Sequence, residues 1–343
     1  MSKKFRVAIV GCGSIAAMHL ACLREMESVE IVAAVDIKID RAAGLAGSCN
    51  AKAYSDYIEM LETEKPDVVH LCTPHYLHAA MALEAAEQGV AVFTEKPPAM
   101  NRKQWKQLEL AADLVPLGIC FQNRYNKNVQ LALGRLRAGE FGELRGIRAN
   151  VYWTRDASYY ADDWHGTWAL EGGGALINQS IHTLDLMNLF LNRPFTSVQA
   201  SMWNHSLEHV IEVEDTMHAY VRYDGIPAMF FATNAYSTNA PVMIELDCEK
   251  ARVVLDGASL VIHWTDRDYE LADTAELAET GFKDYWGRGH AQCIADFYHS
   301  LATDQKAPIS VEDVTQTMDL LYSIYESCGR PSIAEQLNMN LAL

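Results

Sequence analysis

The stretch FRVAIVG at residues 5–11, continued by CGSIAAMHL at residues 12–20, decides the first part of the fold. Its opening residues are mostly apolar, as in a strand that is buried on both faces. Gly11 and Gly13 then lead into a helical pattern. Glycine permits a tight turn and a close approach of the backbone to another group. The stretch therefore predicts a strand, a glycine turn and a helix in immediate succession.

The same alternation of apolar runs and helical patterns continues to residue 121. Further strands are expected at residues 30–36, 67–72, 90–94 and 116–121, and helices at residues 41–47, 56–64, 77–88 and 102–112. Apolar strands that alternate with helices form a doubly wound parallel sheet with right-handed crossovers. We therefore predict an α/β N-terminal domain of the Rossmann type over residues 1–122.

The first turn matches the G-x-G-x-x-A pattern of dinucleotide-binding sheets, and Asp36 ends the second strand. In that pattern backbone amides approach a pyrophosphate and the acid binds the ribose hydroxyls. The expected cofactor contacts are Gly11, Gly13, Ser14, Ile15 and Asp36. A tight turn beside a surface aspartate is the alternative. An acid repels a 2′-phosphate, so NAD is favoured over NADP, although Lys38 and Arg41 leave NADP open.

Two later strand ends read CTPHYLH at residues 72–78 and TEKPP at residues 94–98. Ligands bind at the carboxyl ends of the strands in sheets of this kind. We therefore expect six residues near the nicotinamide: Thr73, Pro74, His75, His78, Glu95 and Lys96. The two histidines could equally be a cap neighbour and a helix-surface residue. As a metal pair they lack further ligands, so no metal is predicted.

The texture changes after residue 122. Alternating strand patterns are expected at residues 143–155, 197–203, 214–223, 228–234, 242–249, 250–256 and 259–264, with helices at 173–190, 290–303 and 311–328. Such strands predict an α+β domain over residues 123–343 with a large, mainly antiparallel open sheet. Apolar and aromatic residues on its outer face suggest a homodimer or homotetramer, although core packing explains them equally.

The segment EGGGALINQSIHTLDLMNLF at residues 171–190 carries polar side chains at helical spacing. Asn178, His182 and Asp185 fall on one face of the expected helix. His182 is then either a substrate-site histidine or a core histidine satisfied by Asp185.

The preceding segment, residues 151–173, is rich in Trp, Tyr and Arg. Flat aromatic faces and guanidinium donors suit a carbohydrate pocket. The expected substrate contacts are Trp153, Arg155, Tyr160 and Trp164, together with Arg124 upstream and Asn178 downstream. A large loop folded on its own aromatics is the alternative, and Arg124 could equally be a contact at the domain junction.

These motifs occur in the order and spacing of one family. The Gly11 turn, Asp36, TPHYLH, EKP and GGGALINQSIHTLD together resemble the glucose–fructose oxidoreductase, inositol dehydrogenase and rhizopine-catabolism family. The resemblance covers nearly the whole chain. It implies two domains, a tightly bound nicotinamide cofactor, and oxidation or reduction of a sugar or cyclitol carbon. It further implies that Lys96 contacts the substrate beside a cis-proline, Pro97.

One position departs from the family pattern. Many of its sugar and inositol dehydrogenases carry aspartate four residues before the histidine, where this chain has Asn178. An amide cannot take a proton, which makes inositol a weaker expectation as the substrate. We expect His182 to exchange the hydroxyl proton while Lys96 polarises the oxygen. An NAD-dependent glycoside hydrolase and a non-catalytic NAD-binding regulator are the alternatives.

Composition excludes several classes of partner and location for this protein. Asp and Glu outnumber Lys and Arg by 45 to 28, a net charge of −17, which argues against nucleic acid or an anionic membrane as a partner. No apolar run suits a membrane helix or a secretory signal, so we expect a cytoplasmic protein. The eight cysteines form no C-x-x-C pair, which favours free thiols. HSLEH at residues 205–209 matches a zinc string but lies in a polar loop.

Overall fold

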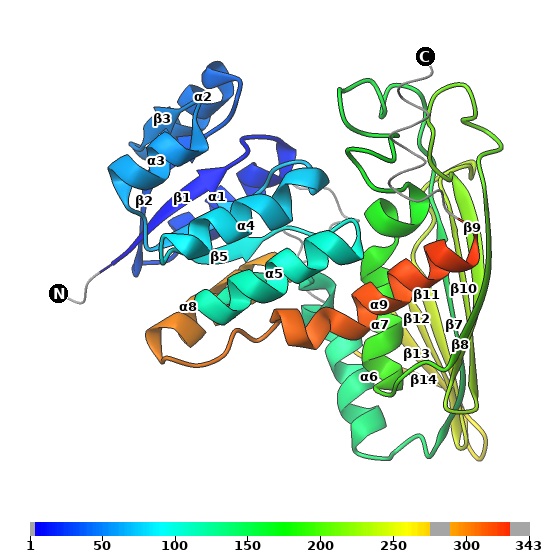
Figure 1. Cartoon of the computed structure of the whole chain (residues 1–343). Coiled ribbons are helices and arrows are strands. Elements are labelled where there is room, and N and C mark those ends of the chain that lie inside the picture. Colours follow the sequence, from blue (N-terminus) through cyan, green and yellow to red (C-terminus); the bar gives the residue numbers. More distant parts are fainter. Residues whose placement is uncertain (1–3, 275–288, 330–343) are drawn as a thin grey trace. The chain divides into compact units, whose positions relative to one another are not determined.

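The computed structural model describes residues 4–274 and 289–329, and the chain divides into two compact units (Figure 1). The first unit runs to Gln122 and also holds α8 (His290–Ala302) and the start of α9 (Val311–Ser327), up to Val314. The second unit begins at Asn123 and takes the rest of α9. The sequence analysis placed its boundary at the same residue but assigned α8 to the second domain. The predicted end of that domain, residue 343, lies outside the described residues.

The first unit contains a parallel sheet of six described strands. They are β1 (Phe5–Val10), β2 (Val29–Val35), β3 (Lys52–Tyr54), β4 (Val68–Leu71), β5 (Ala91–Thr94) and β6 (Leu117–Ile119). Their order is β3-β2-β1-β4-β5-β6, and every neighbouring pair is parallel. The predicted doubly wound sheet is confirmed. The sequence analysis missed β3, whose residues KAY form no apolar run.

Helices connect the strands of this sheet. They are α1 (Ser14–Arg24), α2 (Ile39–Cys49), α3 (Tyr57–Glu64), α4 (His78–Glu87) and α5 (Arg102–Leu114). Side-chain caps fix two of the starts, because Asp56 accepts from the Glu59 amide and Asn101 accepts from the Gln104 amide. Helices α4 and α5 pack side by side, and α1 packs with α8. The first pair is visible in Figure 1.

Backbone hydrogen bonds carry the strand pairing one residue past the carboxyl ends. The amides of Gly11, Cys72, Glu95 and Cys120 each donate to the neighbouring strand, at 2.7–2.9 Å. These four residues therefore lie in a row along one edge of the sheet. It is the edge where parallel sheets of this order bind their ligands.

The second unit contains a sheet of eight described strands. They are β7 (Leu144–Tyr152), β8 (Ser197–Trp203), β9 (Thr216–Tyr223), β10 (Ile226–Thr233), β11 (Met243–Cys248), β12 (Ala251–Asp256), β13 (Ser259–Trp264) and β14 (Glu270–Leu271). The order is β14-β13-β12-β11-β7-β10-β9-β8. All pairs are antiparallel except β7 with β10. The prediction of a large, mainly antiparallel sheet is confirmed.

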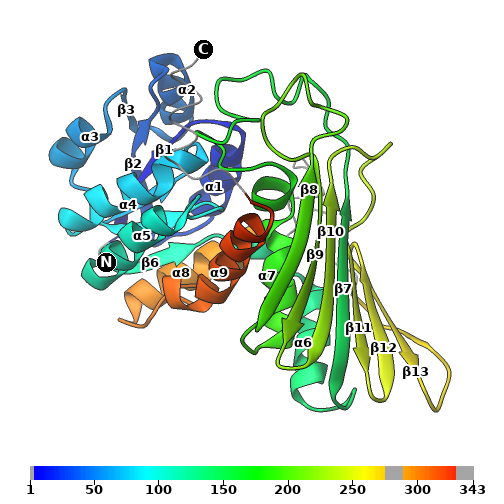
Figure 2. The same cartoon turned by 45° about the vertical axis from the view of Figure 1, so that its right-hand side comes forward.

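One face of this sheet is covered by helices. Figure 2 shows α6 (Lys127–Arg137) and α7 (Ile181–Leu191) along it. In β9 the residues alternate accordingly, with Met217, Ala219 and Val221 buried. Large apolar side chains such as Trp203 and Met229 stay exposed. The homodimer or homotetramer through this sheet stays a prediction.

Within the described residues, no helix combines the length and apolar character needed to cross a membrane. All eight cysteines are free thiols, as predicted, and four of them are buried.

Candidate functional site

The glycine turn after β1 combines a positive φ at its first residue with open space at its second glycine. Gly11 has a φ of +86°, and a Cβ there would lie 2.6 Å from the Cys72 carbonyl oxygen and 2.8 Å from the Thr73 nitrogen. Gly11 is thus dictated by its close approach to the end of β4. A Cβ on Gly13 would meet no described atom within 4 Å. Open space therefore remains at the N-terminus of α1, where anions bind.

Asp36 lies beside this turn, as the sequence predicted. Its Oδ2 accepts from the Cys12 amide at 2.9 Å, and its Oδ1 accepts from the Lys38 amide at 2.8 Å. The carboxylate is therefore fixed by the backbone of both the glycine turn and the residues after β2. The next side chain, Ile37, is 87 % exposed. A fixed carboxylate and an exposed apolar side chain therefore lie together at the end of β2.

The end of β4 supplies a buried polar atom and a structural histidine. The Thr73 Oγ1 is buried and has no hydrogen-bond partner among the described residues. Pro74 precedes a short 3-10 turn, His75–Leu77, in which His75 is buried. Both ring nitrogens of His78 lie 2.8 Å from carbonyl oxygens, those of Pro97 and Thr73. His78 therefore ties the end of β4 to the residues after β5.

Lys96 follows β5 and is half-buried, and the Lys96–Pro97 peptide bond is cis. Glu95 is buried, and its Oε1 lies 2.8 Å from His19 Nε2. Its Oε2 accepts from the Lys96 amide at 3.2 Å. Burial alone would raise the pKa of Glu95, but the hydrogen bond to His19 and the charge of Lys96 contribute to lowering it. Glu95 is thus a buried carboxylate directly behind Lys96.

In the second unit, the glycines of GGGALINQSIHTLD are required by packing. Gly173 has a φ of +152°, and a Cβ there would collide with the Tyr325 hydroxyl. A Cβ on Gly174 would collide with the Glu214 carbonyl oxygen. The Glu214 carboxylate in turn accepts from the Leu176 amide at 3.0 Å and from Tyr325 at 2.9 Å. The glycines let this segment lie directly against β9 and α9.

The helix predicted over residues 173–190 is not one regular helix. A π-helical turn spans Ala175–Gln179, and α7 begins at Ile181. Between them, the Ser180 hydroxyl donates to the Ala175 carbonyl at 2.7 Å. Asn178 and His182 therefore belong to separate segments, so the regular α-helical spacing on which their shared face was predicted does not hold. Glycines and a serine bond to the backbone break the regular spacing.

Asn178 is bound to a residue that the sequence analysis did not select. Its Nδ2 donates to Glu171 Oε1 at 2.6 Å, and Tyr159 Oη lies 3.3 Å away. Glu171 has no exposed surface. Its negative charge is the second cause, after burial, that raises the pKa of Tyr159 to about 12. A carboxylate therefore stands beside position 178 even though the residue there is an amide.

Asp185 and Arg124 form a buried pair. Arg124 Nε and Nη2 donate to the two carboxylate oxygens at 2.7 and 2.6 Å, and Thr317 donates to Oδ1 at 2.9 Å. Asp185 was expected to satisfy His182 if that histidine belongs to the core. The bonds recorded for it go to Arg124 and Thr317. Arg124 was expected in a substrate cleft, and this pair gives it a structural task within the second unit.

The aromatic segment packs largely on itself. Arg155 lies over the rings of Trp153 and Tyr159, at 5.1 and 5.0 Å from their centroids. Tyr160 is buried among Leu207, Ile211 and Val213. The Trp164 ring packs at a tilt against the His165 ring, with ring centroids 3.7 Å apart. The alternative of a loop folded on its own aromatics thus describes much of this segment. The substrate contacts assigned to Trp153, Arg155, Tyr160 and Trp164 stay predictions.

HSLEH forms a loop between β8 and β9. The Asp215 carboxylate accepts from the amides of three consecutive residues, His205, Ser206 and Leu207, at 2.7–3.2 Å. His205 and His209 are exposed and do not share a helix face. The zinc string therefore has a structural explanation.

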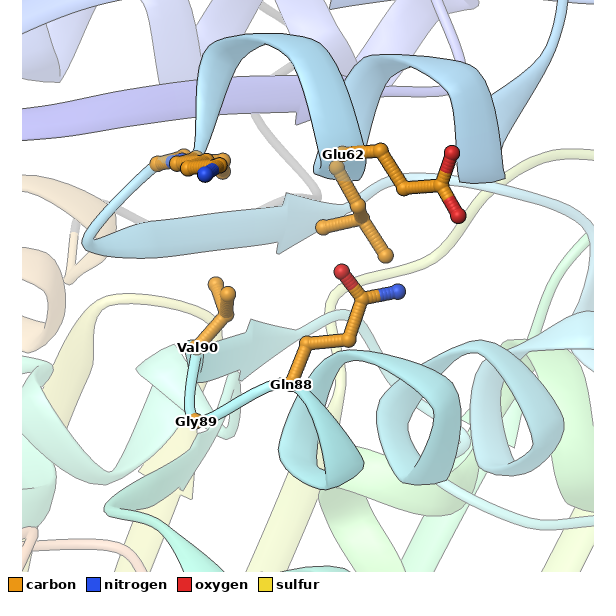
Figure 3. A pocket seen from close by; sticks show the side chains of 7 residues that line it. Glu62, Gln88, Gly89 and Val90 are labelled. Carbon is orange, nitrogen blue, oxygen red and sulfur yellow. The ribbon is translucent and has the colours of Figure 1, made fainter.

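A surface hollow lies elsewhere in the first unit. Figure 3 shows it between Glu62 of α3 and the residues Gln88, Gly89 and Val90 that precede β5. It is at the amino ends of β4 and β5, opposite the edge that carries Gly11, Cys72 and Glu95. It gathers none of the predicted site residues.

Comparison with known proteins agrees with this arrangement. The model of an oxidoreductase family with an NAD-binding Rossmann fold matches residues 5–114. The C-terminal domain model of the same Gfo/Idh/MocA family matches residues 129–254.

Individual relatives point the same way. A D-glucoside 3-dehydrogenase of Escherichia coli is 34% identical over 200 residues, 56% of each chain. An inositol 2-dehydrogenase of Renibacterium salmoninarum is 28% identical over 198 residues, also 56% of each. The chain thus aligns with little more than half the length of these relatives.

Among solved structures, the WlbA dehydrogenase of Bordetella pertussis, in complex with NADH and UDP-GlcNAcA, superposes with a TM-score of 0.83 at 29% identity. The match covers 96% of this chain and 97% of that one. Together with the two family models, it shows that the chain belongs to the Gfo/Idh/MocA oxidoreductase family, with its NAD-binding Rossmann domain and its C-terminal domain.

Proposed function

We propose that the protein is an NAD-dependent oxidoreductase that transfers a hydride between nicotinamide and a hydroxyl or keto carbon of a sugar, sugar derivative or cyclitol. The observation that carries the proposal is the row of groups at the carboxyl edge of the first sheet. There the Gly11 turn, Asp36, Thr73 and Lys96 follow four strands that pair side by side. Relatives named as sugar and inositol dehydrogenases support the substrate class.

The residues at this edge fit the cofactor. The space beside Gly13 and the amides that begin α1 suit a pyrophosphate. The fixed Asp36 carboxylate suits the ribose hydroxyls and disfavours a 2′-phosphate, which supports NAD rather than NADP. The buried Thr73 Oγ1 would gain a partner from the bound group. NAD itself would accept or supply the hydride.

The chain's own residues supply the remaining chemistry. The Lys96 ammonium is suited to bind the substrate oxygen and stabilise the alkoxide that develops on it. Its position after β5 is fixed by the His78 bridge between Thr73 and Pro97. We assign proton exchange to His182, on the strength of the family pattern and of an imidazole pKa near neutrality.

The test is a screen for NAD and NADP reduction with sugars, cyclitols and sugar acids, followed by variants on the best substrate. Lys96→Ala and His182→Ala should each lower kcat/KM by about 100-fold or more, the range for a lost general acid–base or electrostatic group. The dissociation constant for NAD should stay within about threefold, since neither variant removes a pyrophosphate or ribose contact.

Matched controls separate chemistry from surface charge. Lys103→Ala removes an exposed lysine of α5, and His209→Ala removes an exposed histidine of the HSLEH loop. Both should retain the original rate. Near-normal turnover in the Lys96 or His182 variant would remove that residue from the mechanism. Free sugar released without accumulation of NADH would favour a hydrolase instead.

A further inference from the structure

Four buried side chains of the first unit form a continuous chain of hydrogen bonds that ends beside Lys96. Tyr298 Oη of α8 lies 2.9 Å from His70 Nε2 on β4. His70 Nδ1 lies 2.8 Å from His19 Nδ1 on α1, and His19 Nε2 lies 2.8 Å from Glu95 Oε1. None of the four is more than 5% exposed. Their polar atoms are therefore shielded from water and depend on one another for hydrogen bonds.

For a neutral His19, valence fixes the direction of the protons in this chain of hydrogen bonds. A carboxylate only accepts, so His19 Nε2 must carry a proton. A neutral imidazole then accepts at Nδ1, which requires His70 to donate from its own Nδ1. His70 Nε2 is left as an acceptor, and Tyr298 must donate to it. Every donor in the chain thus points from α8 toward Glu95.

The surrounding groups agree with this assignment. Burial raises the pKa of Tyr298 far above its usual range, so the phenol keeps its proton. Burial lowers the pKa of His70 well below its usual range. Burial likewise lowers the pKa of His78, lowers that of His290 to about 4, and raises those of the Cys72 and Cys120 thiols. His70, His290 and the two thiols are therefore neutral at pH 7.

We propose that Tyr298, His70 and His19 are positioning residues, which hold Glu95 as a carboxylate so that Lys96 stays an ammonium ion. Glu95 is the residue before Lys96, and the two side chains interact electrostatically. A neutral His19 leaves the charge of Glu95 for Lys96 to balance. Lys96 then serves the proposed reaction as an electrostatic donor and not as the base. The protonation states themselves do not depend on that reaction.

A metal site is the competing explanation for this cluster. One ligand atom each from His19, Glu95 and Cys120 lie within 4.8 Å of one another, a donor set that suits zinc. Both nitrogens of His19 already have partners, however, and Nε2 carries a proton toward Glu95. A metal would need that nitrogen deprotonated and Cys120 as a thiolate. The hydrogen-bond chain accounts for the contact of His19 with Glu95, and a hydrogen bond between the Cys120 thiol and Glu95 accounts for the third member, without either change.

The first experiment reads the proton positions in the unmodified protein. Two-bond ¹⁵N–¹H spectra of the histidine rings at pH 8 distinguish the two neutral tautomers from imidazolium. We expect His70 protonated at Nδ1 and His19 at Nε2. A proton on Nε2 of His70 would reverse the chain and make His19 an imidazolium, which overturns the proposal. Stoichiometric zinc in the purified protein would overturn it as well.

The second experiment measures the consequence for Lys96. Its pH-dependent acetylation is followed by mass spectrometry in Glu95→Gln, which keeps an acceptor for His19 but removes the charge. The acetylation midpoint should fall by about one pH unit or more, because the ammonium form loses its counter-charge. Glu87→Gln, on the exposed end of α4, makes the same charge change elsewhere and should not move it.

Equal midpoints in the two variants would contradict the proposal. If Glu95→Gln fails to fold, the ring spectra of the unmodified protein still decide it. Neither experiment uses a substrate. A failed substrate screen would therefore count against the proposed function and leave this inference standing.

Discussion

The two units bury polar groups of different kinds. In the first, the buried polar residues include five histidines: His19, His70, His75, His78 and His290. In the second, the buried polar residues around the glycine segment are carboxylates and amides: Glu171, Asn178, Gln179, Glu214, Asp215 and Asn234. The first set changes its proton content near neutral pH when exposed to water, and the second set does not.

The partners differ in the same way. Histidines of the first unit contact one another, Glu95, a tyrosine and two backbone carbonyls. In the second unit, Glu214 and Asp215 accept from backbone amides, and Glu171 accepts from Asn178 and the Gly166 amide. The hydrogen bonds of the second set come largely from backbone amides, whose protons are fixed. The hydrogen bonds of the first set depend on which histidine nitrogens carry protons. Acidification should therefore act on the first unit, and steric change on the glycines should act on the second.

The largest expected effect is in the glycine segment. Gly173→Ala places a methyl group against the Tyr325 hydroxyl at a φ of +152°, and Gly174→Ala places one against the Glu214 carbonyl. Neither neighbour can move without losing a buried hydrogen bond. Each variant should lower the free energy of unfolding by about 4 kcal/mol or more, or fail to fold. Urea unfolding followed by tryptophan fluorescence measures this.

Gly134→Ala is the matched control within the same unit. This glycine lies inside α6, and a Cβ there would meet no described atom within 4 Å. Alanine should be neutral or stabilise by up to about 1 kcal/mol, through helix propensity. If Gly173→Ala behaved like Gly134→Ala, the packing explanation of the GGG motif would be wrong.

These glycines also show how far sequence reasoning reached. The pattern predicted the Rossmann sheet, because strands buried on both faces have a continuous apolar signal, as in VVHL of β4. The GGG motif was recognised as the start of a helical segment. Its π-helical turn was missed, since Tyr325 and Glu214, which dictate the glycines, are remote in sequence.

In the candidate site, too, the residues placed by regular strands were predicted, and those placed by tertiary contacts were not. Gly11, Asp36, Thr73 and Lys96 follow strands whose register is regular, so their placement along one edge was predictable. Glu171 and the chain from Tyr298 to Glu95 were missed. Glu171 directly precedes the glycines, which were interpreted only as the start of a helix. His19 and His70 lie in apolar runs, where a histidine normally signals only a satisfied core residue. Only tertiary contacts give them partners.

Acidification provides the next test of the comparison. Burial lowers the pKa of His290 to about 4, from an ordinary value of 6.5. Between these values the unfolded chain binds the proton and the folded chain does not. Stability is therefore lost as pH falls from about 6.5 toward 4, by about 3 kcal/mol for this group alone. His70 and His78 act in the same direction.

The measurement is urea unfolding at pH 7.5 and pH 5. His290→Leu removes the titrating group and should lose less stability over this range than the original protein. His299→Leu, an exposed position in the last turn of α8, is the matched control and should keep the original dependence. A His290→Leu variant with the full acid sensitivity would show that His290 is not held neutral by the fold.

The smallest expected effect concerns Asn178 in the second unit, where a substitution should make the protein less stable at high pH and not at low pH. Asn178→Asp places a carboxylate where the amide donates to Glu171 at 2.6 Å. Two buried carboxylates at that distance cannot both ionise, so the pair shares one proton in the folded protein. In the unfolded chain both carboxyl groups lose their protons above about pH 4. The free energy of unfolding should fall by about 2 kcal/mol at pH 7.5 and recover toward pH 5.

Two further variants identify the cause. Asn178→Ala loses the hydrogen bond without adding charge, so its loss of stability should be the same at both pH values. Asn178→Asp combined with Glu171→Gln exchanges the amide and the carboxylate and should restore most of the stability. If that exchange also restored any activity found in the substrate screen, the charge itself would matter and not the residue that carries it. In this protein Glu171 would then supply, next to position 178, the negative charge that an aspartate at position 178 supplies in relatives. Asn178→Asp could instead show the flat pH dependence of Asn178→Ala. Glu171 would then not be ionised in the folded protein, and the idea that its carboxylate takes the place of an aspartate at position 178 would be wrong.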